Sequence, residues 1–221
     1  NNIGVGKSAN YHHSIGKLHF DKGELDQALK EMQLSLKYAK QHYNSKHPQV
    51  ALRYNDIAEI YFEKNDIENA LQHYDNARMM LVKNIDDPLK TSDRPELLET
   101  LHGKARCFFK MQNPEQAFTT YQLATQLIDI MRQSYQAEGS KFQLAKNALQ
   151  LYEEAITVTV KLYRNTKDPN YLEAALNFSE KGKATILYES IQENKALEYA
   201  GIPQKRLERE KRLSRNLNFY E

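Results

Sequence analysis

The sequence has few of the residues that end helices or build covalent and metal frameworks. Its 221 residues include 8 Gly, 6 Pro, no Trp and a single cysteine, Cys107. One cysteine excludes an intramolecular disulfide framework and a multi-cysteine zinc site. No apolar stretch approaches the roughly 20 residues of a membrane-spanning helix, so we expect no membrane insertion by this segment. Lys and Arg number 31 against 29 Asp and Glu, and this balance gives no reason to expect nucleic acid as a partner.

Charged residues and helical periodicity are abundant instead. Charged side chains make up 27% of the chain. Apolar residues recur at intervals of three and four positions, and the clearest stripe comprises Leu144, Ala148, Leu151, Ala155, Val158 and Leu162. This spacing places them on one face of a long amphipathic helix, and the sequence therefore predicts an all-α fold. It begins Asn-Asn without a Met or a signal peptide, so we interpret it as a piece of a longer protein whose compartment stays open.

One two-helix pattern occurs three times, and its best copy runs from Lys46 to Ala77. On the first helix of each copy four residues share a face: Tyr54, Ile57, Ala58 and Tyr61, then His12, Ile15, Gly16 and His19, then Leu101, Lys104, Ala105 and Phe108. On the second helix a small residue precedes a larger one by four positions: Ala70 and Tyr74, Ala28 and Met32, Ala117 and Tyr121. Small residues at facing positions let paired helices approach closely.

The turn between the two helices has its own signal. Gly23 and Asn65 occupy the same slot, and both residue types tolerate the left-handed conformation that ends a helix. Gln112 takes that slot in the third copy. There Asn113 and Pro114 supply an N-cap and a first-turn proline for the next helix.

This pattern resembles the tetratricopeptide (TPR) repeat. Ala28 and Ala70 are 42 residues apart, whereas the usual TPR repeat has about 34 residues. The longer period, with the opening "HPxVA" at His47–Ala51, resembles kinesin-light-chain-type TPRs. The resemblance implies an α-solenoid of TPR-like antiparallel helical hairpins. We place about four hairpins, approximately at residues 5–45, 46–90, 91–138 and 139–200, and a connector helix at 201–221 toward a missing C-terminal domain.

The C-terminal part resembles bacterial proteins in which TPRs precede a CHAT domain, a caspase-like peptidase fold. In those proteins an E-x-x-K-A helix is followed by a GIP turn and a charged helix. Glu180, Lys183 and Ala184 match the first element, and residues 201–203 read Gly-Ile-Pro. The resemblance implies a regulatory N-terminal part, with the peptidase residues beyond Glu221. Rival interpretations are the sensor region of a bacterial histidine kinase or transcription regulator, and a free-standing assembly scaffold.

Function in a solenoid resides on the concave face that the first helices line. Positions one, five and eight residues after the first pattern residue point away from the packed side. They give nine candidate partner-binding residues: His13, Lys17, Phe20, Asn55, Glu59, Phe62, His102, Arg106 and Phe109. Recurring rings beside mixed charge suit a protein or peptide ligand in the concave groove. The alternative is that the three Phe rings pack against the next repeat.

We find no catalytic or metal-binding arrangement in the sequence, and expect neither a cofactor nor enzymatic activity in this chain. His12 and His19 are seven residues apart, too far for one metal ion, and fall on packing positions. His102 and Cys107 are five residues apart and diverge by about 140° around a helix. That divergence argues against a thiol–base pair.

Two further ligand classes are disfavoured. TPRs that bind heat-shock chaperone tails carry a two-carboxylate clamp, at whose slots this chain has His13, Lys17, Asp56, Glu99 and Gly103. Asp56 and Glu99 would repel a carboxylate, so we do not expect a chaperone tail as partner. Residues 205–216 are rich in Lys and Arg, but the stripe Leu213, Leu217 and Tyr220 favours a helix packed on a neighbour over one that contacts phosphates.

Overall fold

Helices account for all the regular structure in the part of the chain that the computed structural model describes. That part comprises residues 2–43, 46–82, 89, 94–135 and 138–199. The helices are α1 (Asn2–Asp21), α2 (Leu25–His42), α3 (Pro48–Glu63), α4 (Ile67–Leu81), α5 (Arg94–Lys110), α6 (Pro114–Ser134), α7 (Glu138–Thr166) and α8 (Pro169–Tyr199). The prediction of an all-α fold is confirmed. The connector helix expected at 201–221, with its Gly-Ile-Pro turn, lies outside the described residues.

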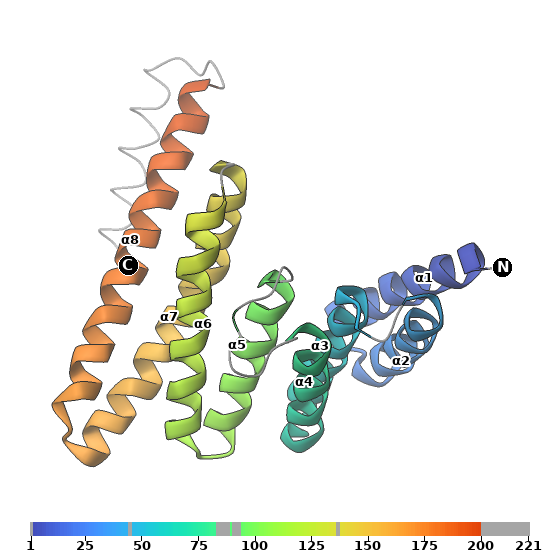
Figure 1. Cartoon of the computed structure of the whole chain (residues 1–221), viewed down its shortest axis with the longest axis horizontal. Helices are drawn as coiled ribbons and strands as arrows, with labels where there is room; N and C mark the ends of the chain where they lie inside the picture. The colour runs from blue at the N-terminus through green and yellow to red at the C-terminus, as the bar shows by residue number, and fades with distance from the viewer. Residues whose placement is uncertain (1, 44–45, 83–88, 90–93, 136–137, 200–221) are drawn as a thin grey trace.

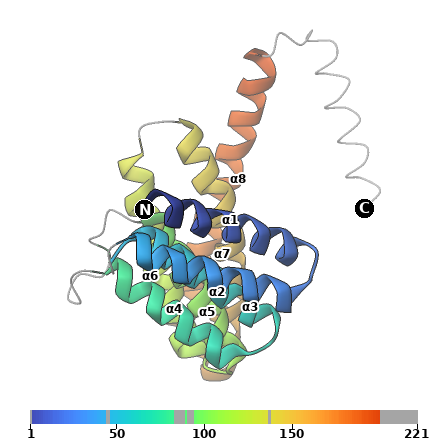
Figure 2. The ribbon, with the colours of Figure 1, turned by 90° about the vertical axis from the view of Figure 1, so that its right-hand side faces the viewer.

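The helices form antiparallel hairpins that stack side by side into an α-solenoid (Figure 1). α1 packs on α2, α3 on α4, α5 on α6, and α7 on α8. Each hairpin also packs on the next, through α2 and α3, α4 and α5, and α6 and α7. Figure 2 shows α1 to α4 in front of the later hairpins, with the C-terminal end of α8 projecting beyond the other helices. The stack is therefore continuous from α1 to α8.

A left-handed residue lies in the turn of every hairpin. Gly23 has φ 76°, Asn65 has φ 60° and Gln112 has φ 58°, which confirms the slot predicted from the repeat. Lys167, with φ 60°, takes the corresponding place between α7 and α8, where the repeat pattern did not identify it. Left-handed backbone costs a non-glycine residue about 1 kcal/mol, and the packing of the flanking helices holds it there.

Side chains at the predicted N-cap Asn113 and at Asp66 bind the first turn of the following helix. Asn113 accepts a hydrogen bond from the backbone amide of Gln116 at 3.2 Å, and Pro114 follows it in the first turn of α6. Asp66 does the same at the start of α4, accepting from the amide of Asn69 at 3.3 Å. These contacts satisfy backbone donors that have no partner within the helix.

Small residues lie where paired helices cross. Ala58 on α3 and Ala70 on α4 are fully buried in one cluster with Tyr74, which confirms the predicted register. A Cβ on Gly16 of α1 would lie 3.0 Å from Cγ of Met32 on α2. At these crossings a larger side chain would force the helices apart.

Two polar residues at packing positions are accommodated by partners. Lys104 stands where the other copies of the repeat carry isoleucine, and its ammonium donates to Asp75 on α4. His12 stacks on Tyr38, with ring centroids 5.5 Å apart, and its Nδ1 is 2.7 Å from a Glu31 carboxylate oxygen. The contacts of His12 come from within the first hairpin, so this residue belongs to the packing between α1 and α2.

Candidate functional site

Polar and aromatic side chains connect the first helices of consecutive hairpins. We call the surface that α1, α3, α5 and α7 share, around His13, Asn55, His102 and Glu154, the groove face. Eight of the nine candidate partner-binding residues contact a neighbouring first helix there. The ninth, Phe20, packs against the core that the first hairpin and α3 share. The candidates thus form a connected framework from one end of the stack to the other.

Asp56 joins α3 to α1. Its side chain is only 6% exposed, with one carboxylate oxygen 3.0 Å from Nε2 of His13. The other oxygen accepts a longer hydrogen bond, of 3.5 Å, from the exposed ammonium of Lys17. Two of the predicted groove residues on α1 therefore converge on a single buried carboxylate of α3.

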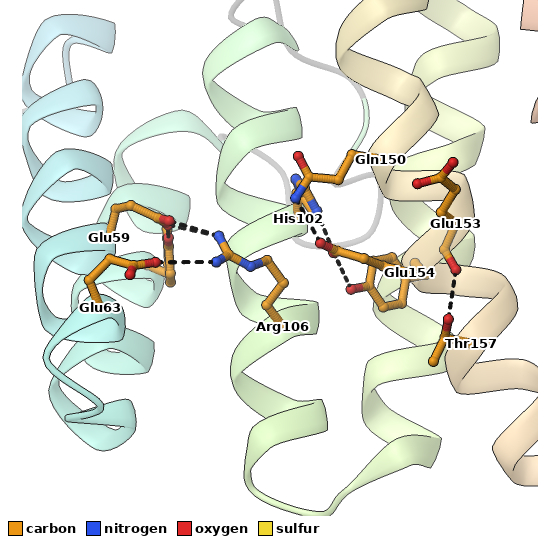
Figure 3. A network of polar contacts seen from close by, with 10 residues as sticks. Glu59, Glu63, His102, Arg106, Gln150, Glu153, Glu154 and Thr157 are labelled. Atoms are coloured by element: carbon orange, nitrogen blue, oxygen red, sulfur yellow. Dashed lines mark hydrogen bonds and ion pairs between the residues drawn. The ribbon is translucent and has the colours of Figure 1, made fainter. Parts of the chain in front are cut away.

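Glu59 joins α3 to α5 (Figure 3). Nη1 of Arg106 donates to both Glu59 carboxylate oxygens, at 2.8 and 3.1 Å, and Tyr74 donates its hydroxyl at 2.7 Å. The Arg106 guanidinium also lies 4.0 Å from the centre of the Phe62 ring. Burial, together with the neighbouring Glu59 charge and its hydrogen bond, raises the pKa of Tyr74 far above its usual range. Its phenol therefore stays a neutral donor.

Glu154 joins α7 to α5 in a comparable way (Figure 3). One carboxylate oxygen lies 2.6 Å from Nε2 of His102 and accepts from Tyr121 at 2.8 Å, while Gln150 donates to the other at 2.9 Å. Burial alone would raise the pKa of Glu154, but these donors and the His102 charge hold it below its usual value. The carboxylate is therefore charged and fully engaged by protein groups.

Asn55 has a different role from the one predicted. The residue is 1% exposed, its amide nitrogen donates to the Glu96 carbonyl at 3.0 Å, and its side-chain oxygen accepts from Thr100 at 2.9 Å. Both partners lie on α5. The prediction that Asn55 contacts a ligand directly is corrected, because its side chain is enclosed between α3 and α5 and fixes their relative position.

The three Phe rings of the predicted ladder are half-buried. Phe62 lies beneath Arg106 and within 5.9 Å of the Lys110 ammonium, and Phe109 lies 4.9 Å from the Lys161 ammonium. Cations over ring faces are attracted by the ring quadrupole. Each of these two rings therefore already has a cation on one face, and its remaining exposed area is what a ligand could contact.

Two cavities open between α5 and α7. The larger, about 750 Å³, is lined by Leu98, Met131, Leu144 and Leu151 with the carboxylates of Glu96 and Glu99. The smaller, about 280 Å³, is lined by Phe62, Arg106, Phe109, Lys110, Tyr121 and Glu154. His102 lines the larger and its partner Glu154 the smaller, so this pair separates them. The larger cavity thus has two acidic lining residues, and the smaller has two cationic residues and one carboxylate.

Glu99 lies beside other carboxylates. Its carboxylate has one long polar contact, of 3.5 Å, to the Asn55 amide nitrogen. Burial on the groove face and the charge of Asp56 raise the pKa of Glu99 to about 7, against the opposing charge of Lys17. Because Glu99 also reaches solvent, screening moderates the size of this shift without changing its direction.

Several groove residues were not identified from the sequence. Tyr121 was recognised only as a packing residue, and Glu154 and Lys161 on α7 were not singled out. The fourth hairpin follows after a longer interval than the others, so the slots that located candidates on α1, α3 and α5 could not be transferred to α7. The available signal was a Tyr at the same slot of α4 and α6, Tyr74 and Tyr121. Each hydroxyl donates to a carboxylate of the groove face, Glu59 and Glu154 respectively.

The remaining sites considered at the sequence level show no catalytic geometry in the described residues. Cys107 is fully buried, which raises the pKa of its thiol to about 12, and the His102 ring is bound to Glu154 instead. Within the described ranges no group of three or more His, Cys, Asp or Glu side chains could hold a metal ion. The described helices also include none with the length and apolar character needed to cross a membrane.

These features define an α-solenoid of helical hairpins. The N-terminal third of the chain also matches a known protein family. Residues 7–81, from α1 through α4, match the Tetratricopeptide repeat family. This segment is therefore similar to the TPR repeat, in agreement with the sequence pattern. No curated protein sequence matches the chain.

Solved structures extend the similarity along the stack. The crystal structure of BtubC (BKLC) from P. vanneervenii superposes with a TM-score of 0.61 at 15% identity, covering 80% of this chain and 64% of that one. The chain thus spans less than two thirds of the length of that protein. A Podosopora anserina protein of the kinesin light chain kind, with nearly identical TPR-like repeats, gives a TM-score of 0.52 at 15% identity over 80% of this chain and 74% of its own. At this identity the similarity shows the fold alone.

Proposed function

We propose that this chain is a scaffold that binds a protein or peptide along its groove face. A TPR region and a solenoid of hairpins are generally non-catalytic and present extended surfaces to partners. The observation that carries the proposal is the groove face itself, where polar contacts link four successive first helices and two open cavities are lined by residues of α3, α5, α6 and α7. Such a surface offers both apolar contact area and charges that fix the register of a ligand.

The distribution of charge supports an uncharged or mixed-charge partner over a strongly acidic one. Asp56, Glu59, Glu99 and Glu154 all lie on the groove face, beside the cations Lys17 and Arg106. A chaperone tail with two carboxylates would meet Asp56 and Glu99, which would repel it. This arrangement supports our expectation that neither such a tail nor nucleic acid is the ligand.

The test compares two charge-matched variants in a pull-down from the source cells, with quantitative mass spectrometry. Lys17→Ala/Lys110→Ala removes two exposed cations from the groove face, and Lys30→Ala/Lys37→Ala removes two exposed cations from α2. We expect the groove variant to lose partners that the α2 variant retains. Identical partner lists, with unchanged melting temperatures, would contradict binding on the groove face.

We further propose that the scaffold is the regulatory N-terminal part of a bacterial CHAT-domain protein. The support is the sequence resemblance of residues 172–213, of which Glu180, Lys183 and Ala184 lie exposed on α8. Ligand binding to the array would then control the peptidase-like domain. The coding sequence beyond Glu221 tests this: an α/β domain with a His and a Cys supports it, and a kinase core or a DNA-binding domain favours the sensor alternative.

A further inference from the structure

Charge is divided along α5. Glu96 and Glu99 lie in its N-terminal half, next to the larger cavity, and Arg106 and Lys110 lie in its C-terminal half, next to the smaller one. His102 stands between the two halves. Figure 3 shows it directed toward Glu154 on α7, while Arg106 is directed toward α3. The two ends of the same helix therefore present opposite charges to whatever lies on the groove face.

The larger cavity combines apolar lining residues with the acidic residues Glu96 and Glu99. Leu98 is 9% exposed, Leu144 5% and Leu151 1%, so α5 and α7 already bury most of these side chains and present only part of their surface. In the part of the chain that the structure describes, neither Glu96 nor Glu99 forms an ion pair. The positive charge of Lys17 lowers the pKa of Glu99, but the Lys17 ammonium donates its hydrogen bond to Asp56 and not to Glu99.

This combination restricts the chemistry of an occupant. An anionic group would be repelled by both carboxylates. A purely apolar group would cover them without supplying a partner, and a buried unpaired charge is unfavourable. A flexible aliphatic stem with a cationic head satisfies both requirements, because the stem can lie on the leucines while the head reaches the carboxylates.

We propose that the larger cavity binds a Lys or Arg side chain of a protein partner, with the stem on Leu98, Leu144 and Leu151 and the cation between Glu96 and Glu99. This inference rests on the proposed function, since it names the residue that the groove ligand presents. Glu99 is suited to this role because its carboxylate has only a long contact, of 3.5 Å, to the Asn55 amide nitrogen and lies beside Asp56, whose charge a bound cation would offset. The smaller cavity, rich in cations, would not accept the same side chain.

The probe is n-hexylguanidinium, titrated into the ¹⁵N-labelled 221-residue chain and followed by amide chemical shifts. Hexanoate and hexanol have hydrocarbon chains of similar length but carry a negative charge or none. We expect hexylguanidinium to shift amides in the first half of α5 and near Leu144–Leu151, and to bind more tightly than either control. Glu96→Gln/Glu99→Gln should weaken it about fivefold or more, because both partner charges are lost.

The matched control is Glu153→Gln/Glu115→Gln, which removes two exposed carboxylates that do not line the cavity. It should leave the affinity for hexylguanidinium unchanged. Equal binding of hexanoate or hexanol to the unaltered chain, shifts confined to other helices, or full affinity in Glu96→Gln/Glu99→Gln would each overturn the proposal. The first two readouts need no variant, so they hold even if the double variant folds poorly.

The two proposals fail separately. Loss of partners by Lys17→Ala/Lys110→Ala without any hexylguanidinium binding would leave the scaffold function standing and remove the cation pocket. Hexylguanidinium binding at the larger cavity, with a partner list that the groove variant does not change, would keep the cation preference of the cavity and contradict partner binding on the groove face.

Discussion

The Tyr74 ring on α4 occupies the space that a side chain at residue 103 on α5 would need. A Cβ on Gly103 would fall well inside van der Waals contact of the ring and its hydroxyl. The same hydroxyl donates to Glu59 at 2.7 Å, so the ring cannot turn aside without losing that bond. Gly103 thus allows the second and third hairpins to approach, and this approach brings Arg106 to Glu59.

Gly103→Ala should therefore destabilise the chain. Overpacking of a filled site typically costs about 1–3 kcal/mol, and we expect a lowered urea midpoint for unfolding. Gly4→Ala is the matched control, because nothing lies within 4 Å of a Cβ at Gly4 in α1. Alanine favours helix over glycine by up to about 1 kcal/mol, so the control should be unchanged or stabilised. Equal midpoints for the two variants would show that Tyr74 moves away freely.

The crossing of α3 and α4 gives a second test. Ala70→Leu places a larger side chain against the fully buried Ala58, and we expect a loss of about 1–3 kcal/mol in unfolding free energy. Glu68→Leu introduces the same side chain at an exposed position on the same helix and should change stability by less than about 0.5 kcal/mol. A thermal melt in which Ala70→Leu matches the parent would contradict the repeat register.

The fold was predictable because its determinants are local. The spacing of Ala58, Ala70 and Tyr74 lies within one hairpin, and the left-handed turn at Asn65 depends only on its neighbours in sequence. Lys167 escaped prediction because lysine is not a residue that favours this conformation, so only the packing of α7 on α8 selects it.

The site was less predictable because its contacts join different hairpins. The repeat register placed Glu59 and Arg106 at equivalent slots of α3 and α5, but their 47-residue separation carried no sign that they would bind each other. That pairing depends on the offset between α3 and α5, which packing around Gly103 and Asn55 sets. For the same reason the burial of Asn55 could not be read from its slot.

The raised pKa of Glu99 predicts a pH dependence of stability. The pKa of the Glu99 carboxyl rises on folding, from 4.5 to about 7. Its ionisation therefore favours the unfolded chain, and the folded chain loses stability as the pH rises from 4.5 through about 7. Asp56 and Glu59 on α3 oppose its ionisation, and Lys17 on α1 favours it. Glu99→Gln should therefore raise the melting temperature at pH 8 but not at pH 4.

The control for this prediction is Glu153→Gln, an exposed carboxylate on α7. It should leave the difference in melting temperature between pH 4 and pH 8 as it is in the parent chain. A Glu99→Gln profile parallel to that of the parent would show that solvent screens Glu99 from its neighbours.

Cys107 should be chemically inert in the folded chain. It is fully buried and its thiol pKa is raised to about 12, so the reactive thiolate is scarce at neutral pH. We expect no reaction with a disulfide reagent such as dithionitrobenzoate until denaturant is added. We likewise expect no cleavage of a peptide library by the purified chain; cleavage that Cys107→Ala abolishes would contradict the non-catalytic assignment.

The ion pair between Arg106 and Glu59 should contribute to stability as well as to the groove face. Its side chains are 21% and 32% exposed, so the charges are partly desolvated and the pair couples α3 to α5. A double-mutant cycle with Glu59→Gln and Arg106→Gln should give a coupling energy of about 0.5–3 kcal/mol in urea unfolding. Lys17→Ala, at an exposed residue, should change stability by less than about 0.5 kcal/mol. A coupling energy near zero would mean that Arg106 is held mainly by the Phe62 ring, and that its guanidinium is available to a ligand.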